Sequence, residues 1–276
     1  MKQSLRTKLE YRIDRKMQNL RKHGKAPFIM AVIHGGPGAP GEMAPVARQL
    51  SSSGGVLEPL QTKTTVEGQV QELKDILQRS GKRPVILIGW SWGAWLCFIF
   101  SAQYPSSVKK LILIGSGPFE EKYAQDIMKI RLSRLSQQEK KEILSLTETL
   151  NNPASGDKNT AMARFGDLIS KADSYAPMPH QNEIVECQYD LHQKVWDQAS
   201  KLRRSGELLE LGRNILCPVV AIHGDYDPHP AEGVKGTLSR ILKDFRFILL
   251  DKCGHQPWIE RYAKDRFYDI LKSELG

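Results

Sequence analysis

Residues 84–95 read PVILIGWSWGAW and join two apolar runs through a Gly-Trp-Ser-Trp-Gly turn. A short, wholly apolar run is typical of a buried strand, and the longer run after the turn is typical of a buried helix. A sharp turn between them would lift the hydroxyl of Ser91 above the sheet and direct the amino end of the helix at it. Gly89 and Gly93 then allow the close approach of strand and helix.

The alternation of strands and helices extends on both sides of this turn. Apolar runs predict strands at 28–33, 54–60, 85–89, 108–115, 218–224 and 245–251, separated by helical patterns. Such alternation predicts an α/β fold, with a mostly parallel sheet covered by helices on both faces. Residues 119–212 carry helical periodicity almost throughout, which predicts a helical cap. The core is then formed by 28–118 and 213–276, behind a basic N-terminal leader at 1–27.

Composition and charge exclude several classes of protein. No apolar run approaches the roughly 20 residues of a membrane span, and the first 20 residues lack the apolar stretch of a signal peptide. We therefore expect a cytoplasmic protein without a membrane span, whose four cysteines are reduced. Residues 1–27 hold nine Lys or Arg against two acidic residues, and so carry +7 of the net +9 charge. A charge run is usually solvated, so we expect no nucleic-acid partner.

Ser91 needs a base and an acid to act as a nucleophile, and both follow later strands. IHGDYDPHP places Asp225 and Asp227 after the strand at 218–224, and LLDKCGHQPW places His255 after the strand at 245–251. The order predicts a catalytic triad of Ser91, Asp227 and His255. Asp227 is favoured over Asp225 because it lies farther into the loop, whereas Asp251 is expected to anchor the loop that holds His255.

An acyl-transfer reaction also needs hydrogen-bond donors for the oxyanion. HGGPG at 34–38 follows the first core strand. Gly36 can present its backbone N–H there with no side chain in the way. Trp92, directly after the serine, supplies a second N–H at the start of a helix. Gly36 and Trp92 are therefore the predicted oxyanion hole.

These motifs together resemble the α/β-hydrolase family over nearly the whole chain. HGGPG combined with Trp92 is similar to the proline iminopeptidase branch, whose members release amino-terminal residues from peptides. The resemblance implies an α/β-hydrolase fold, the same triad and the same oxyanion donors. The chain departs from the branch at the serine turn, which has Gly89-Trp90 where the branch has Gly-Gly.

The sequence leaves the identity of the substrate open. An aminopeptidase needs carboxylates for a substrate ammonium, and Glu183 and Glu186 are expected to share one face of a helix. Of the flanking tryptophans, one is expected to pack on the sheet and the other to face the acyl pocket, which makes Trp90 a candidate substrate contact.

An esterase would need only an apolar pocket, to which Met162, Phe165 and Trp196 could contribute. A non-catalytic protein of the same fold would bind a ligand without turnover, and an acyltransferase would pass the acyl group to an acceptor other than water. A small-molecule or short-peptide substrate is expected, with no cofactor and no metal. The oligomeric state is left open.

Overall fold

The computed structural model describes residues 19–181 and 183–275, so most of the predicted leader at 1–27 lies outside the described residues. Seven strands form one sheet in the order β1-β3-β2-β4-β5-β6-β7. All neighbours are parallel except β1 and β3, which pair antiparallel. The strands are β1 (Leu20–His23), β2 (Phe28–Ile33), β3 (Gly55–Pro59), β4 (Val85–Trp90), β5 (Val108–Ile114), β6 (Val219–Gly224) and β7 (Phe245–Leu250).

Helices cover both faces of the sheet, as the apolar strand sequences require. One buried cluster joins alternate residues of the strands to helices α3, α4, α8 and α10, and the other joins the intervening residues to α2 and α11. The helices are α2 (Ala44–Leu50), α3 (Val66–Ser80), α4 (Trp92–Gln103), α5 (Ile127–Ser133), α6 (Gln137–Asn151), α7 (Lys158–Asp173), α8 (Tyr189–Ser205), α9 (Glu207–Glu210), α10 (Glu232–Leu238) and α11 (Lys264–Leu275). Short 3₁₀ helices occupy Pro105–Ser107, Glu121–Tyr123, Leu211–Asn214 and Pro257–Ile259.

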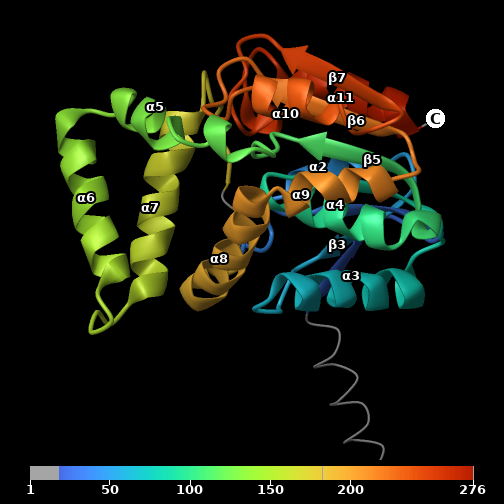
Figure 1. The fold of residues 1–276 in the computed structure, drawn as a ribbon, viewed down its shortest axis with the longest axis horizontal. Helices are drawn as coiled ribbons and strands as arrows, with labels where there is room; N and C mark the ends of the chain where they lie inside the picture. Colours follow the sequence, from blue (N-terminus) through green and yellow to red (C-terminus); the bar gives the residue numbers. More distant parts are fainter. Residues whose placement is uncertain (1–18, 182, 276) are drawn as a thin grey trace, which may run out of the picture.

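The chain between β5 and β6 forms helices α5 to α9. Helices α6 and α7 lie side by side and project from the rest of the molecule, while α8 crosses back toward the sheet (Figure 1). Helices α6 and α7 share a small apolar cluster of their own, which includes Ile143 and Leu168. Between β5 and β6 the described chain therefore adds helices and no strand to the sheet.

The predicted boundary of the leader at residue 27 is wrong for residues 20–23. These residues form β1 at the edge of the sheet, and Leu20 pairs with Pro59. The strand is mostly polar, and two of its side chains lie against the buried carboxylate of Glu58. His23 Nε2 lies 2.7 Å from Glu58 Oε2, and Arg21 Nη1 lies 3.8 Å from Glu58 Oε1.

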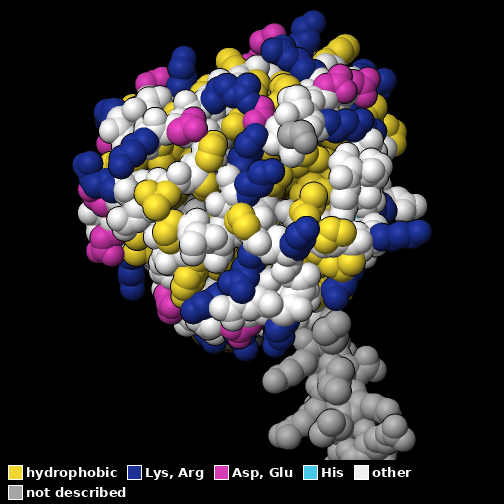
Figure 2. Space-filling view, turned by 90° about the vertical axis from the view of Figure 1, so that its right-hand side faces the viewer, with side chains coloured by type: hydrophobic (Ala, Val, Ile, Leu, Met, Phe, Trp, Pro, Cys, Tyr) yellow, Lys and Arg dark blue, Asp and Glu magenta, His cyan; other side chains and the backbone are white. Residues whose placement is uncertain are grey.

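Charge is dispersed on the face shown in Figure 2, where basic side chains are interspersed with acidic and hydrophobic ones. Within residues 19–181 and 183–275, none of the helices combines the length and apolar character needed to cross a bilayer.

The order of the strands fixes where a site can form. β2 lies between β3 and β4. The chain after β2 therefore runs to β3 on one side, and the chain after β4 runs to β5 on the opposite side. The loops after β2 and β4 therefore diverge at the carboxyl edge of the sheet, which opens a crevice at this switch point. HGGPG follows β2 and Ser91 follows β4, so both line this crevice.

Candidate active site

Ser91 occupies a strained backbone position between β4 and α4. Its φ is 54° and its ψ is −118°, a region that costs a non-glycine residue roughly 1–3 kcal/mol. Its N–H donates to the carbonyl of Ile114 at 3.0 Å, which ties the turn to β5. A Cβ at Gly89 would lie 2.2 Å from the carbonyl oxygen of Gly93, and one at Gly93 would lie 2.3 Å from that of Ile33. Only glycine fits either position.

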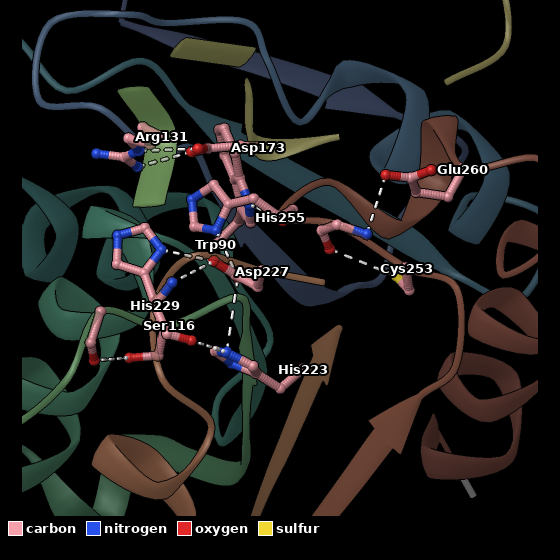
Figure 3. Close-up of polar contacts among 12 residues, drawn as sticks. Trp90, Ser116, Arg131, Asp173, His223, Asp227, His229, Cys253, His255 and Glu260 are labelled. Atoms are coloured by element: carbon pink, nitrogen blue, oxygen red, sulfur yellow. Dashed lines mark hydrogen bonds and ion pairs between the residues drawn. The ribbon is translucent and has the colours of Figure 1, made fainter. Parts of the chain in front are cut away.

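His255 and Asp227 meet above the ends of β6 and β7. His255 Nδ1 lies 2.7 Å from Asp227 Oδ2, and both residues are buried (Figure 3). An ionised carboxylate only accepts hydrogen bonds, so Nδ1 carries the imidazole proton and Nε2 is left as the basic nitrogen. Ser91 and His255 line the same cavity.

The surroundings of Asp227 keep its carboxyl ionised. Burial alone would raise the pKa of Asp227, but His255, His229 and His223 outweigh burial and hold this pKa well below its ordinary value. The backbone N–H of His229 also donates to Oδ1 at 2.9 Å. A carboxylate that accepts several hydrogen bonds is stabilised in its charged form.

The other two aspartates of these loops have separate places. Asp225 is exposed, and its Oδ1 accepts a hydrogen bond of 3.0 Å from the N–H of Cys253, two residues before His255. Asp251, which we expected to anchor this loop, is exposed and lies 3.7 Å from Arg266. Asp225, not Asp251, therefore braces the loop that holds His255.

The two flanking tryptophans point to different parts of the fold. The indole of Trp90 donates to the carbonyl oxygen of His255 at 2.8 Å, and its ring packs edge-on against Trp258. The indole of Trp92 donates to the side-chain oxygens of Gln61 and Gln69, each at 3.0 Å. Both tryptophans are at least 95% buried. Trp90 thus braces the His255 loop, and Trp92 anchors the start of α4.

Gly36 lies in the loop after β2, with a φ of 26°. Gly36, Ser91 and Trp92 line one cavity, and Trp92 is the first residue of α4, where backbone N–H groups lack partners within the helix. The residues predicted for the oxyanion hole therefore open into the same cavity as the serine.

The segment before α8 contacts the Gly36 loop through its backbone. The N–H groups of Gln188 and Val185 donate to the carbonyls of Gly38 and Pro40 at 2.8 and 2.9 Å. On α8 itself, His192 Nδ1 donates to the carbonyl of Pro37 at 2.9 Å. A Cβ at Gly38 would lie 2.5 Å from the carbonyl oxygen of Gln188, so this approach depends on glycine.

Ser91 opens into a cavity of about 1020 Å³ between the sheet edge and the helices that follow β5. Met162, Phe165 and Trp196, suggested by the sequence for an apolar pocket, all line it. Further apolar lining residues are Ile127, Met128, Leu150, Ile169, Trp258 and Ile259. The cavity is large enough for a substrate of several residues or a substituted acyl group.

The prediction that Glu183 and Glu186 share a helix face is wrong. Both line the cavity but lie in an irregular segment between α7 and α8. Glu183 forms an ion pair with Arg48, and its hydrogen bonds from this guanidinium lower the pKa of Glu183. Glu186 is exposed. The charge of Glu183 is therefore already compensated.

Two lining residues were missed from the sequence. Among the described residues, Oε2 of Glu42 is buried without a hydrogen-bond partner, and burial raises the pKa of Glu42 to about 8. His229 contacts Asp227 beside His255. Their only sequence signals are position: Glu42 ends the glycine- and proline-rich loop after β2, and His229 lies two residues after Asp227.

In the part of the chain that the structure describes, Asp227, His229 and His255 form the set that could hold a metal ion, since one ligand atom of each lies within 4.8 Å of the others. Both carboxylate oxygens of Asp227 already accept hydrogen bonds from the two imidazoles. This arrangement suits proton transfer by His255 and does not need a metal ion.

Comparison with known proteins identifies the family of the chain. A family model described as the alpha/beta hydrolase fold matches residues 51–262. A proline iminopeptidase of Lactobacillus delbrueckii subsp. bulgaricus is 25% identical over 289 residues, covering 91% of this chain and 90% of that protein.

Among solved structures, VinJ has a TM-score of 0.64 and 17% identity, and the match covers 94% of this chain and 95% of VinJ. The proline iminopeptidase of Mycobacterium smegmatis has a TM-score of 0.59 and 15% identity, with 93% of each chain covered. The chain is a hydrolase of the α/β-hydrolase family, and the resemblance to the proline iminopeptidase branch predicted from its sequence is confirmed.

Proposed function

We propose that the protein is a serine hydrolase that cleaves an ester or amide bond through an acyl-enzyme. The observation that carries this proposal is the placement of Ser91, on its strained turn, in the same cavity as a histidine whose Nδ1 is held by Asp227. Residues 119–212 act as the cap that closes the cavity.

The mechanism follows from the atoms that face the cavity. His255 Nε2 takes the proton of the Ser91 hydroxyl as the serine oxygen attacks the substrate carbonyl. The N–H groups of Gly36 and Trp92 stabilise the oxyanion of the tetrahedral intermediate. His255 then gives the proton to the leaving group, whose bond to the acyl carbon breaks. Water, deprotonated by His255, attacks the acyl-enzyme, the bond between the acyl carbon and the Ser91 oxygen breaks, and His255 returns the proton to Ser91 as the acid leaves.

A free amino group next to the scissile bond is the substrate feature that we favour. The curated relatives are proline iminopeptidases, and the unpartnered carboxyl of Glu42 gives the cavity wall a group that can pair with an ammonium. With its pKa near 8, Glu42 is largely protonated at pH 7. Binding of an ammonium ion displaces that proton, so affinity rises with pH.

A carboxylesterase is the second candidate, and the apolar wall formed by Met162, Phe165 and Trp196 favours it. Such a wall would bind an uncharged acyl or alcohol group by burial of apolar surface. In that case Glu42 would stay protonated.

The test compares prolyl and alanyl 4-nitroanilides, their N-acetylated forms and a short-chain 4-nitrophenyl ester, with the wild type, Ser91→Ala and Glu42→Gln. We expect turnover of the free-amine anilides, its loss in Ser91→Ala, and a KM that falls between pH 6 and 8 in the wild type but not in Glu42→Gln. Equal turnover of the acetylated anilides would contradict the amine subsite.

Ester turnover alone would favour the esterase. Absence of turnover together with absence of fluorophosphonate labelling at Ser91 would instead indicate a non-catalytic binding protein.

A further inference from the structure

A second histidine is bound to the carboxylate of Asp227. His229 Nδ1 lies 2.7 Å from Oδ1, while His255 Nδ1 lies 2.7 Å from Oδ2 (Figure 3). The two rings are 4.6 Å apart between centroids. The triad described above uses only one of these imidazoles, so the role of the other is unassigned.

His229 fixes the orientation of the carboxylate. Its backbone N–H and its Nδ1 both donate to the same oxygen, Oδ1, at 2.9 and 2.7 Å. This occupies one side of the carboxylate and leaves Oδ2 for His255. The carbonyl of His229 in turn accepts a hydrogen bond of 2.8 Å from Nε2 of His223, so β6 holds His229 in place.

The protonation state of His229 determines what it contributes. Burial lowers the pKa of His229 to about 4, so the ring is neutral at pH 7. Its single proton lies on Nδ1, because the ionised Asp227 can only accept. His229 therefore withdraws carboxylate charge through a hydrogen bond but adds no positive charge beside His255.

We propose that His229 is a positioning residue that presents Oδ2 of Asp227 to His255 and limits the basicity of His255. The proposal rests on the triad of the proposed function. A carboxylate that accepts hydrogen bonds from two imidazoles stabilises the charged form of either imidazole less than a carboxylate that accepts from one. The reason is that part of the carboxylate charge is already compensated by the other donor. Removal of the His229 donor therefore raises the affinity of His255 for its proton.

The remaining charged and titratable groups around this cluster are already held by other contacts. His223 Nε2 lies 3.7 Å from Asp227 Oδ2. Arg131, which lies near His229, pairs with Asp173 at 2.6 Å, and the carbonyl of Asp173 accepts from the N–H of His255. Asp225 and Glu260 accept from the N–H groups of Cys253 and Gly254, just before His255. None of these contacts uses the side chain of His229, since His223 donates to its backbone carbonyl.

Three replacements distinguish the roles of the two ring nitrogens of His229. His229→Asn keeps a donor at the place of Nδ1, His229→Gln keeps only a polar group at the place of Nε2, and His229→Phe keeps the ring and neither nitrogen. The first readout is the second-order rate of fluorophosphonate labelling of Ser91 between pH 5 and 9. The second is the pKa of His255 from its C2–H proton resonance in the Ser91→Ala background, which requires no activity.

We expect His229→Phe and His229→Gln to slow labelling about tenfold and to raise the pKa of His255 by about 0.5–1. His229→Asn should label within about threefold of the wild type and keep its pKa. A wild-type pKa in both His229→Phe and His229→Gln would overturn the proposal, as would His229→Asn behaving like His229→Phe. A wild type that is not labelled at Ser91 would overturn the proposed function alone, since the titration still reports on His229.

Discussion

The indole of Trp90 donates a hydrogen bond of 2.8 Å to the carbonyl oxygen of His255, so the residue before the serine holds the main chain of the histidine. The two segments are 165 residues apart in sequence. Their rings also contact each other, with centroids 5.2 Å apart. The relative position of Ser91 and His255 therefore depends on a buried side chain adjacent to both.

Replacement of Trp90 by Phe tests this contact. The ring is retained in part, but the donor is lost, which leaves a buried carbonyl without its partner and costs about 1–3 kcal/mol. We expect a lower free energy of unfolding and a kcat reduced about tenfold, with less change in KM, because the histidine is less well placed. Urea unfolding and steady-state kinetics measure these effects. An unchanged kcat would show that other contacts hold the His255 loop.

Ser91→Gly and Ser91→Ala form a matched pair that measures the strain at the turn. Both remove the hydroxyl of Ser91, the proposed nucleophile, and should abolish turnover. Only glycine adopts a φ of 54° with a ψ of −118° without steric cost, so Ser91→Gly should exceed Ser91→Ala in unfolding free energy by about 1 kcal/mol or more. Equal stability of the two variants would contradict a strained serine.

Gly89→Ala should be strongly destabilising, because the new methyl group would meet the carbonyl of Gly93 at 2.2 Å. A loss of more than about 3 kcal/mol, or insoluble protein, is expected. Gly166→Ala is the control: it lies inside α7, and a Cβ there meets nothing within 4 Å. That variant should gain up to about 1 kcal/mol from helix propensity. Thermal unfolding of both variants distinguishes a packing constraint from a general effect of added methyl groups.

Asp227→Asn and Asp225→Asn should have different effects, although the two residues are two positions apart. Asp227→Asn removes the charge beside His255 and, for the proposed triad, should lower kcat by about 10³-fold or more. Asp225→Asn retains an oxygen that can accept from Cys253 and should keep kcat within a few fold. Comparable losses in both variants would argue against Asp227 as the acidic member of the triad.

Stability should depend on pH through Glu42. The pKa of Glu42 is raised by burial from 4.5 to about 8, so the folded protein retains a proton that the unfolded chain loses above pH 4.5. This contribution to stability is complete below pH 4.5 and is lost as the pH rises to 8. Glu42→Gln cannot ionise, so its unfolding free energy relative to the wild type should increase between pH 5 and 9. Urea unfolding at both pH values measures this; a constant difference would contradict a buried, protonated carboxyl.

The parts of the fold that the sequence predicts are those governed by local pattern. The wholly apolar run at 28–33 forms a strand over the same residues, and the run at 108–115, apolar apart from Lys109 and Lys110 near its start, forms one at 108–114, because parallel strands buried on both faces are mostly apolar. The tight turn at Ser91 was predictable from Gly89 and Gly93. The meeting of His255 with Asp227 follows from their positions after adjacent parallel strands.

The remaining features depend on tertiary contacts that have no local signal. β1 has a mostly polar sequence, and its place in the sheet depends on pairing with β3 and on the contacts of Arg21 and His23 with Glu58. Glu183 and Glu186 have helical spacing, but this segment satisfies backbone groups with Pro40 and Gly38 instead of with its own next turn. His229 and Glu42 are functional candidates only because folding places them against Asp227 and the cavity.

The hydrogen bonds between the Gly36 loop and the segment 183–188 have a consequence for divergence within the family. They join main chain to main chain, so they do not require particular side chains on that segment, of which Glu186 and Cys187 line the cavity. The lining of the cavity can therefore exchange its residues here during evolution without displacing the loop that carries Gly36. Substrate preference and the chemistry of bond cleavage are thereby able to evolve separately.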